Sequence, residues 1–194
     1  MKKRVVIIHG WADKPERGWL GWLAMQLREQ GYEVLNPAMP NAKKPSITEW
    51  VETVKQTSGT LDENTILVGH SLGTYVLLRY LSEYSQSDKV KALILVSGFL
   101  SVKPRNNSNN TDKTDHKKFF SPAPDLKLVQ DKATEIYHIY SDDDTMVEPA
   151  RSKELVDLLG GYSLELHGMG HFLSRDLTEF PELLKVIDII NTIE

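Results

Sequence analysis

A serine stands between two glycines in the pattern Gly-His-Ser-Leu-Gly at residues 69–73. The pattern matches G-x-S-x-G, a sharp turn from a strand into a helix that lifts the serine hydroxyl clear of a sheet. A short apolar run at residues 65–68 precedes it and an apolar helical pattern at 72–84 follows it, which is the context that such a turn requires. We therefore predict that Ser71 is a nucleophile. The alternative is an ordinary tight turn in which Ser71 caps the helix.

A serine hydroxyl is a weak nucleophile at neutral pH, so a histidine must accept its proton and an acidic residue must orient that histidine. In proteins built around this turn, the three residues follow in the order serine, acid, histidine. Asp142, Asp143 and Asp144 follow a strand predicted at residues 136–140 and supply the acid. The residue types alone do not choose among the three, because aspartates at such a position also cap turns and helices.

Six histidines are candidates for the base, and their positions separate them. His171 lies in Gly-Met-Gly-His-Phe at residues 168–172, a loop that can bring an imidazole over the edge of the sheet. His167 directly ends the last predicted strand and is the alternative. The other four fall at the end of the first strand, in the serine turn, in a polar loop and inside a strand: His9, His70, His116 and His138. We therefore predict that His171 is the base.

A reaction at the serine also needs two fixed N–H donors for the oxyanion that develops on the substrate. One donor in this geometry is the backbone amide after the nucleophile, here Leu72, and the other comes from a loop after an early strand. His-Gly-Trp at residues 9–11 is such a loop, and Gly10 lets its backbone approach closely. We predict that the amide of Trp11 is the second donor. A plain strand-ending turn is the alternative.

Strands and helices alternate along the chain. Short β-branched or alternating apolar runs predict strands at residues 5–8, 33–36, 65–68, 92–96, 136–140 and 163–166. Apolar residues at helical spacing predict helices at residues 19–30, 46–57, 72–84, 149–159 and 180–193. This alternation indicates right-handed crossovers and a mostly parallel sheet that is covered on both faces. We predict a three-layer α/β fold with about six strands, in a single domain over residues 1–194.

Composition and charge limit the classes of partner. The 194 residues are 40% hydrophobic and 26% charged, which is typical of a globular protein in water. A net charge of −4 gives no general attraction to nucleic acid or to anionic lipid, and no apolar run is long enough to span a membrane. The absence of cysteine excludes a thiolate nucleophile and thiolate metal sites. We therefore expect a cytoplasmic protein that acts on a small molecule rather than on nucleic acid or a membrane.

One segment departs from the alternating pattern. Residues 103–118 contain the run Arg-Asn-Asn-Ser-Asn-Asn and have little to bury, so we predict a polar surface loop there. The functional alternative is a partial lid over the serine, because the segment comes after the strand that follows the serine helix.

These motifs resemble those of the small serine hydrolases typified by retinoblastoma-binding protein nine and the YdeN-like proteins, a family with the α/β-hydrolase fold. The similar segments are residues 6–11, 18–23, 36–41, 69–73, 141–144 and 170–172. In that family the aspartate directly precedes a short segment that ends in proline. Asp144 is followed by Thr-Met-Val-Glu-Pro, so the resemblance favours Asp144 over its two neighbours.

The resemblance implies a compact α/β-hydrolase fold without a large cap domain. It implies that His171 deprotonates Ser71, that Asp144 orients His171, and that the reaction passes through an acyl-enzyme with no metal or organic cofactor. The substrate would be a small ester, thioester or amide, among which the residues do not distinguish. The alternative is a hydrolase-fold module that binds a protein partner with little or no turnover. The oligomeric state is left open.

Overall fold

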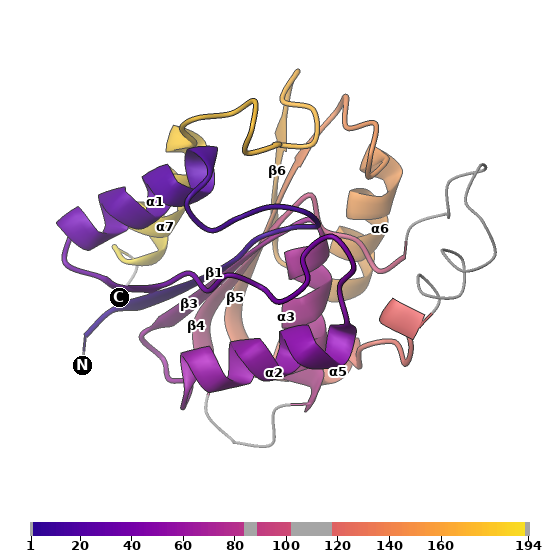
Figure 1. Ribbon diagram of the computed structural model, residues 1–194, viewed down its shortest axis with the longest axis horizontal. Helices are drawn as coiled ribbons and strands as arrows, with labels where there is room; N and C mark the ends of the chain where they lie inside the picture. Colours follow the sequence, from indigo (N-terminus) through magenta and orange to yellow (C-terminus); the bar gives the residue numbers. More distant parts are fainter. Residues whose placement is uncertain (1, 84–88, 102–117, 193–194) are drawn as a thin grey trace.

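The computed structural model describes residues 2–83, 89–101 and 118–192, and its centre is a sheet of six parallel strands (Figure 1). The strand order across the sheet is β2-β1-β3-β4-β5-β6, and every pair of neighbours is parallel. The strands are β1 (Arg4–Ile8), β2 (Glu33–Leu35), β3 (Thr65–His70), β4 (Val90–Val96), β5 (Ala133–Ser141) and β6 (Tyr162–Leu166). All six lie where the sequence predicted a strand, and the predicted α/β class is confirmed.

In the described part of the chain, five helices connect these strands and a sixth follows β6. They are α1 (Gly18–Glu29), α2 (Ile47–Ser58), α3 (Leu72–Glu83), α5 (Leu126–Lys132), α6 (Pro149–Leu159) and α7 (Pro181–Ile190). Five of them match the predicted helices to within a few residues. Helix α5 was not predicted, because only Val129 of its seven residues is buried and no apolar repeat marks it. Asp125 caps its first turn, since its carboxylate accepts from the amides of Lys127 and Leu128.

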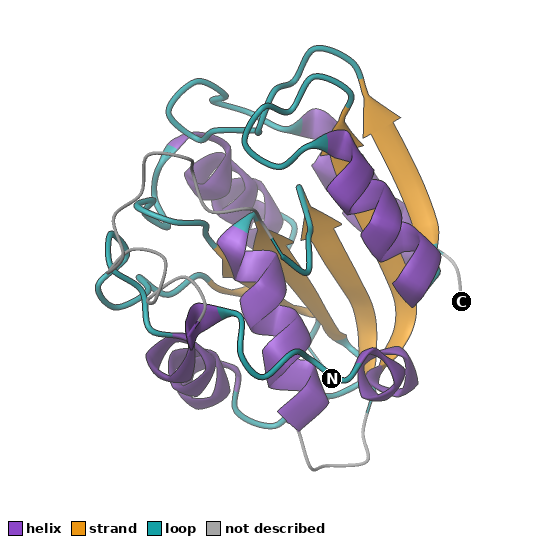
Figure 2. Cartoon of the chain, turned by 90° about the vertical axis from the view of Figure 1, so that its right-hand side faces the viewer, coloured by secondary structure: helices purple, strands orange, loops and turns teal. Residues whose placement is uncertain are grey.

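The helices form two layers, one on each face of the sheet (Figure 2). Helices α1 and α7 pack on one face, and α2, α3, α5 and α6 pack on the other. The side chains of one strand alternate between the two layers. In β1, Val5 and Ile7 contact the α1 and α7 layer, whereas Val6 and Ile8 contact the opposite layer. Both faces are therefore apolar, which accounts for the unbroken hydrophobic runs of the central strands.

Parallel strands bring their carboxyl ends to the same edge of the sheet. The chain leaves β1 towards β2 on one side and leaves β3 towards β4 on the other side, so the strand order reverses between β1 and β3. Ligand sites of such sheets lie at this edge, beside the reversal point. The loops that carry the predicted site residues follow β1, β3, β5 and β6, and all four therefore meet there.

Two further expectations from the sequence concern the polar loop and a membrane-spanning segment. The predicted polar loop at residues 103–118, with its alternative as a lid, lies outside the described residues except for Lys118. Within the described ranges, no helix combines the length and the apolar character needed to cross a membrane.

Candidate active site

Ser71 lies in a tight turn between β3 and α3, with a backbone φ of 51°. This left-handed conformation is unusual for a residue with a side chain and costs about 1–2 kcal/mol. The amide of Ser71 donates to the carbonyl of Val96 on the neighbouring strand, at 2.9 Å. The flanking glycines are needed for space. A Cβ on Gly73 would lie 2.2 Å from the carbonyl oxygen of Ile8, and one on Gly69 would lie 2.8 Å from the backbone of the following helix.

Three predicted side chains meet at this turn. The Oγ atom of Ser71 lies 2.9 Å from Nε2 of His171, and Nδ1 of His171 lies 2.7 Å from Oδ2 of Asp144. His171 and Asp144 are buried, with 6% and 4% of their surfaces exposed. A carboxylate can only accept, so Nδ1 of His171 carries the hydrogen and its Nε2 lone pair faces the serine hydroxyl. This arrangement can remove a proton from Ser71.

Asp144 is held from several sides. Its Oδ1 accepts from the amides of Met146 and Val147, each at 2.9 Å. Its Oδ2 accepts from Oγ of Ser97 at 3.0 Å as well as from His171. Burial alone would raise the pKa of this carboxyl, but the hydrogen bonds and the charge of His171 outweigh it, and the pKa lies below its ordinary value. Asp144 is therefore ionised at neutral pH, as an orienting acid must be.

Asp142 and Asp143 make their hydrogen bonds with the loop after β6 rather than with the imidazole of His171. Asp142 accepts from Nδ1 of His167 at 2.8 Å and from the amide of Gly168 at 3.0 Å. Asp143 accepts from the amide of Gly170 at 2.8 Å. His167 pairs with Asp142 at the surface, where 85% of its side chain is exposed. Neither aspartate contacts His171. Instead, both fix the backbone of the loop that leads to it.

The loop after β1 passes directly beside the nucleophile. A Cβ on Gly10 would lie 3.1 Å from Cβ of Ser71, so a side chain there would push this loop or the serine aside by a few tenths of an ångström. Within the described ranges, the amides of Trp11 and Leu72 donate to no protein acceptor. The indole of Trp11 donates to the carbonyl of Lys43 at 3.0 Å, and 57% of Trp11 is exposed. Two free amides thus flank the serine, one from each predicted segment.

His9 fixes the shape of that loop. Its Nδ1 donates to the carbonyl of Gly10 at 2.8 Å, and its Nε2 accepts from the amide of Met39 at 3.0 Å. Because one nitrogen donates and the other accepts, the ring is neutral. Burial lowers the pKa of His9, in agreement with this state. The amide of Ala12 donates to the carbonyl of Ala42 at 2.8 Å and closes the loop.

Three contributors to the site were not found from the sequence. Ser97, at the end of β4, donates to Asp144. Trp19 in α1 donates through its indole to the carbonyl of Phe172 at 2.8 Å, and His70 lies 2.9 Å through Nε2 from the carbonyl of His171. The only available signal was position, since Ser97 and His70 both stand at the carboxyl end of a strand.

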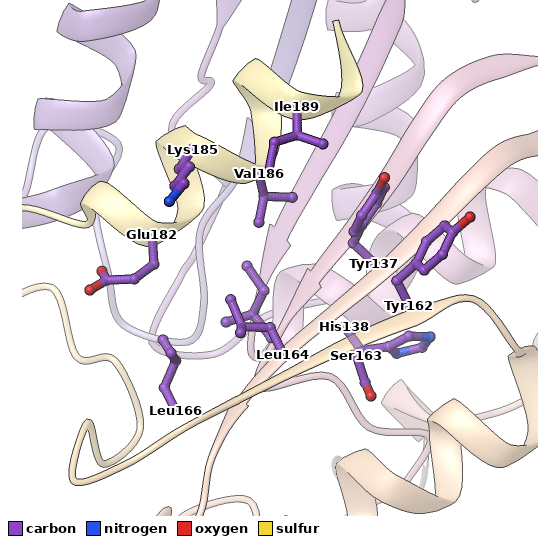
Figure 3. Close-up of a pocket in the computed structure, with 11 residues that line it drawn as sticks. Tyr137, His138, Tyr162, Ser163, Leu164, Leu166, Glu182, Lys185, Val186 and Ile189 are labelled. Atoms are coloured by element: carbon purple, nitrogen blue, oxygen red, sulfur yellow. The ribbon is translucent and has the colours of Figure 1, made fainter. Parts of the chain in front are cut away.

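A surface groove of about 390 Å³ lies elsewhere, against β5, β6 and α7 (Figure 3). Its walls include Tyr137 and Tyr162, whose rings stack 5.1 Å apart, and the apolar side chains of Leu164, Val186 and Ile189. None of the three side chains that meet at the serine turn lines it. The groove is therefore separate from the candidate active site.

Comparisons with known sequences find relatives along nearly the whole chain. A family model for serine hydrolases matches residues 5–188. YdeN of Bacillus subtilis (strain 168) is 30% identical over 195 residues, covering 99% of this chain and 96% of YdeN. Serine hydrolase RBBP9 of Rattus norvegicus is 28% identical over 187 residues, covering 96% of this chain and 93% of RBBP9.

Solved structures share the fold. The crystal structure of the B. subtilis ydeN gene product has a TM-score of 0.88 at 30% identity and covers 98% of this chain and 100% of its own. Esterase RhEst1 from Rhodococcus sp. ECU1013 has a TM-score of 0.67 at 14% identity and covers 100% of this chain and 92% of its own. That likeness concerns the fold alone. The α/β-hydrolase fold predicted from the sequence is thereby confirmed. Because the family model spans almost the whole sequence, this chain belongs to the serine hydrolase family.

Proposed function

We propose that this protein hydrolyses a small acyl substrate with Ser71 as nucleophile, His171 as general base and Asp144 as the acid that orients it. One observation carries the proposal, namely the continuous chain of contacts from Ser71 Oγ to His171 Nε2 at 2.9 Å and from His171 Nδ1 to Asp144 Oδ2 at 2.7 Å. These contacts aim the three groups at one another in the order that acyl transfer needs.

The reaction follows from these contacts in two halves. Oγ of Ser71 attacks the carbonyl carbon of the substrate while Nε2 of His171 takes the hydroxyl proton. The tetrahedral intermediate collapses, the bond to the leaving group breaks, and His171 returns the proton to that group. Water then attacks the acyl-serine ester with His171 again as base, which releases the acid and restores Ser71. Asp144 stays ionised throughout and stabilises the imidazolium.

The oxyanion of each intermediate is assigned to the amides of Trp11 and Leu72. Their support is that both amides lack a protein acceptor in the described ranges and that both belong to segments adjoining Ser71. Leu72 is also the first residue of α3, and the amino end of a helix carries partial positive charge that favours an anion. Fixed donors of this kind contribute about 3–4 kcal/mol each to transition-state stabilisation.

The bond that is cleaved is an ester, a thioester or an amide, and a carboxylester is the first to test. RhEst1, which has the same fold at 14% identity, is an esterase. Among the described residues, Trp11 places a half-exposed aromatic ring directly after the glycine that contacts Ser71. Such a ring suits an apolar acyl or alcohol group.

A panel of p-nitrophenyl esters of increasing chain length, an acyl thioester and an acyl anilide tests the proposal. We expect turnover on at least one ester, and we expect Ser71→Ala to reduce kcat by about 10⁶-fold. Turnover that survives in Ser71→Ala would contradict the assignment. A folded wild-type protein without turnover, which also fails to react with a fluorophosphonate, would favour a protein-binding module instead.

A further inference from the structure

The residue before the nucleophile is a buried histidine with an unusual set of partners. His70 is 2% exposed, and its Nε2 lies 2.9 Å from the backbone carbonyl oxygen of His171. A carbonyl oxygen can only accept, so Nε2 of His70 carries the hydrogen. Nδ1 of His70 is buried and has no hydrogen-bond partner among the described residues. It faces Gly10, where a Cβ would lie 3.3 Å away.

A second buried ring holds the next carbonyl along the chain. The indole of Trp19 donates to the carbonyl of Phe172 at 2.8 Å. Trp19 and His70 are also in edge contact, with ring centroids 5.5 Å apart. Phe172 has a φ of 49°, so the chain turns sharply here and these carbonyls have no place in a helix or a sheet. Buried carbonyls outside regular structure still need hydrogen-bond donors, and here two neighbouring rings supply them.

The geometry points to His70 as a positioning residue for the base. Its Nε2–H holds the backbone of His171 in the place where the imidazole of His171 lies 2.9 Å from Ser71 Oγ. His70 and Ser71 are adjacent in the chain, so one turn fixes both the nucleophile and the backbone of its base. This inference rests on the proposed function, because it concerns the same reaction.

The neutral state of His70 supports this role. Burial, followed by the proximity of His171, lowers the pKa of His70 to about 4. A neutral ring can donate to the carbonyl without placing a second positive charge beside the imidazolium that forms during the reaction. The two ring centroids are 5.2 Å apart, a distance at which two charges in a buried site would repel strongly.

A matched pair of substitutions separates positioning from simple filling of space. The amide nitrogen of glutamine reaches about as far as Nε2 of histidine, whereas that of asparagine reaches only as far as Nδ1. We expect His70→Asn to lower kcat by about tenfold to a hundredfold with KM nearly unchanged, since small displacements of a catalytic group have effects of this size. We expect His70→Gln to recover most of that loss at a similar melting temperature. Equal kcat in both variants, or losses that follow stability alone, would contradict the inference.

A second measurement needs no variant. Long-range ¹H–¹⁵N spectra of the wild-type protein should show the Nε2–H tautomer for His70, and an Nδ1–H tautomer would overturn the inference. The two proposals fail in different ways. A wild-type protein that neither hydrolyses esters nor reacts with a fluorophosphonate contradicts the proposed function. An active wild type with equally active His70→Asn and His70→Gln variants contradicts only the role of His70.

Discussion

Ser97 donates its hydroxyl to Oδ2 of Asp144 at 3.0 Å, so the end of β4 contacts the carboxylate that follows β5. Ser97 is fully buried and has a φ of 48°, an uncommon conformation that the surrounding structure must stabilise. Ser97→Ala removes one of four hydrogen bonds to the carboxylate and leaves that of His171. We expect kcat to fall by about tenfold, because a hydrogen bond to a charged group contributes about 1.5–3 kcal/mol. Ester turnover measures this effect. Ser163→Ala, at an exposed serine, is the control and should have no effect.

The three neighbouring aspartates should differ sharply in their effect on turnover. Asp144→Asn keeps the shape of the side chain but presents a donor to Nδ1 of His171 in one orientation, which favours the wrong tautomer. We expect kcat to fall by about 10⁴-fold. Asp142→Asn is the matched control, since Asp142 contacts His167 and Gly168 at the surface, and it should change kcat less than about tenfold. Similar losses in the two variants would argue against Asp144 as the orienting acid.

Ser71 and His171 could be predicted from the sequence because local patterns mark both of them. Ser71 and His171 stand among glycines in the loops that leave β3 and β6, so their surroundings already indicated a turn. Asp144 needed the resemblance to a family, because its neighbours have the same side chain and only geometry separates them. Asp142 and Asp143 accept hydrogen bonds from backbone amides of the loop that carries His171, whereas Asp144 contacts His171 itself.

The contributors that were missed act through contacts between distant parts of the chain. Ser97 is 47 residues from Asp144, and Trp19 is 153 residues from Phe172. The sequence placed Trp19 at the start of a predicted helix, but it did not indicate where the indole N–H points. The fold was easier to predict, because the buried runs of β3 and β4 and the apolar faces of the long helices are local signals.

Gly73 should not tolerate a larger residue. A Cβ there would lie 2.2 Å from a backbone oxygen of β1, and backbone atoms cannot move aside as a flexible side chain would. We expect Gly73→Ala to lower the free energy of unfolding by more than about 3 kcal/mol, measured by urea denaturation. Gly31→Ala is the control, because its Cβ would meet nothing within 4 Å and only its positive φ matters. It should cost about 1–2 kcal/mol, and an equal cost at the two positions would contradict the steric argument.

The protonation of His70 should make the protein less stable in mild acid. Burial and the nearby His171 lower its pKa from 6.5 to about 4, although the charges of Asp13 and Asp144 partly oppose this. Between these two values the unfolded chain binds the proton and the folded protein does not. The free energy of unfolding therefore decreases as the pH falls from 6.5 and levels off below about 4, and this one group accounts for about 3 kcal/mol.

His70→Gln does not titrate, so its stability should depend less steeply on pH over this range. Urea denaturation at pH 7, 5.5 and 4.5 measures the difference between the variant and the wild type. His9 and His138 also have pKa values lowered by burial, but they act in the same direction in both proteins and cancel in the comparison. Parallel curves for the two proteins would show that His70 does not carry the expected shift.

The covalent product of a serine-directed inhibitor identifies the reacting residue. The protein is treated with a fluorophosphonate, digested, and the modified peptide is sequenced by mass spectrometry. We expect one adduct, on Ser71, formed about a thousandfold or more slowly in Asp144→Asn and absent in Ser71→Ala. An adduct on another serine, or a folded wild-type protein that forms none, would contradict the assignment of Ser71, His171 and Asp144 as the reacting groups.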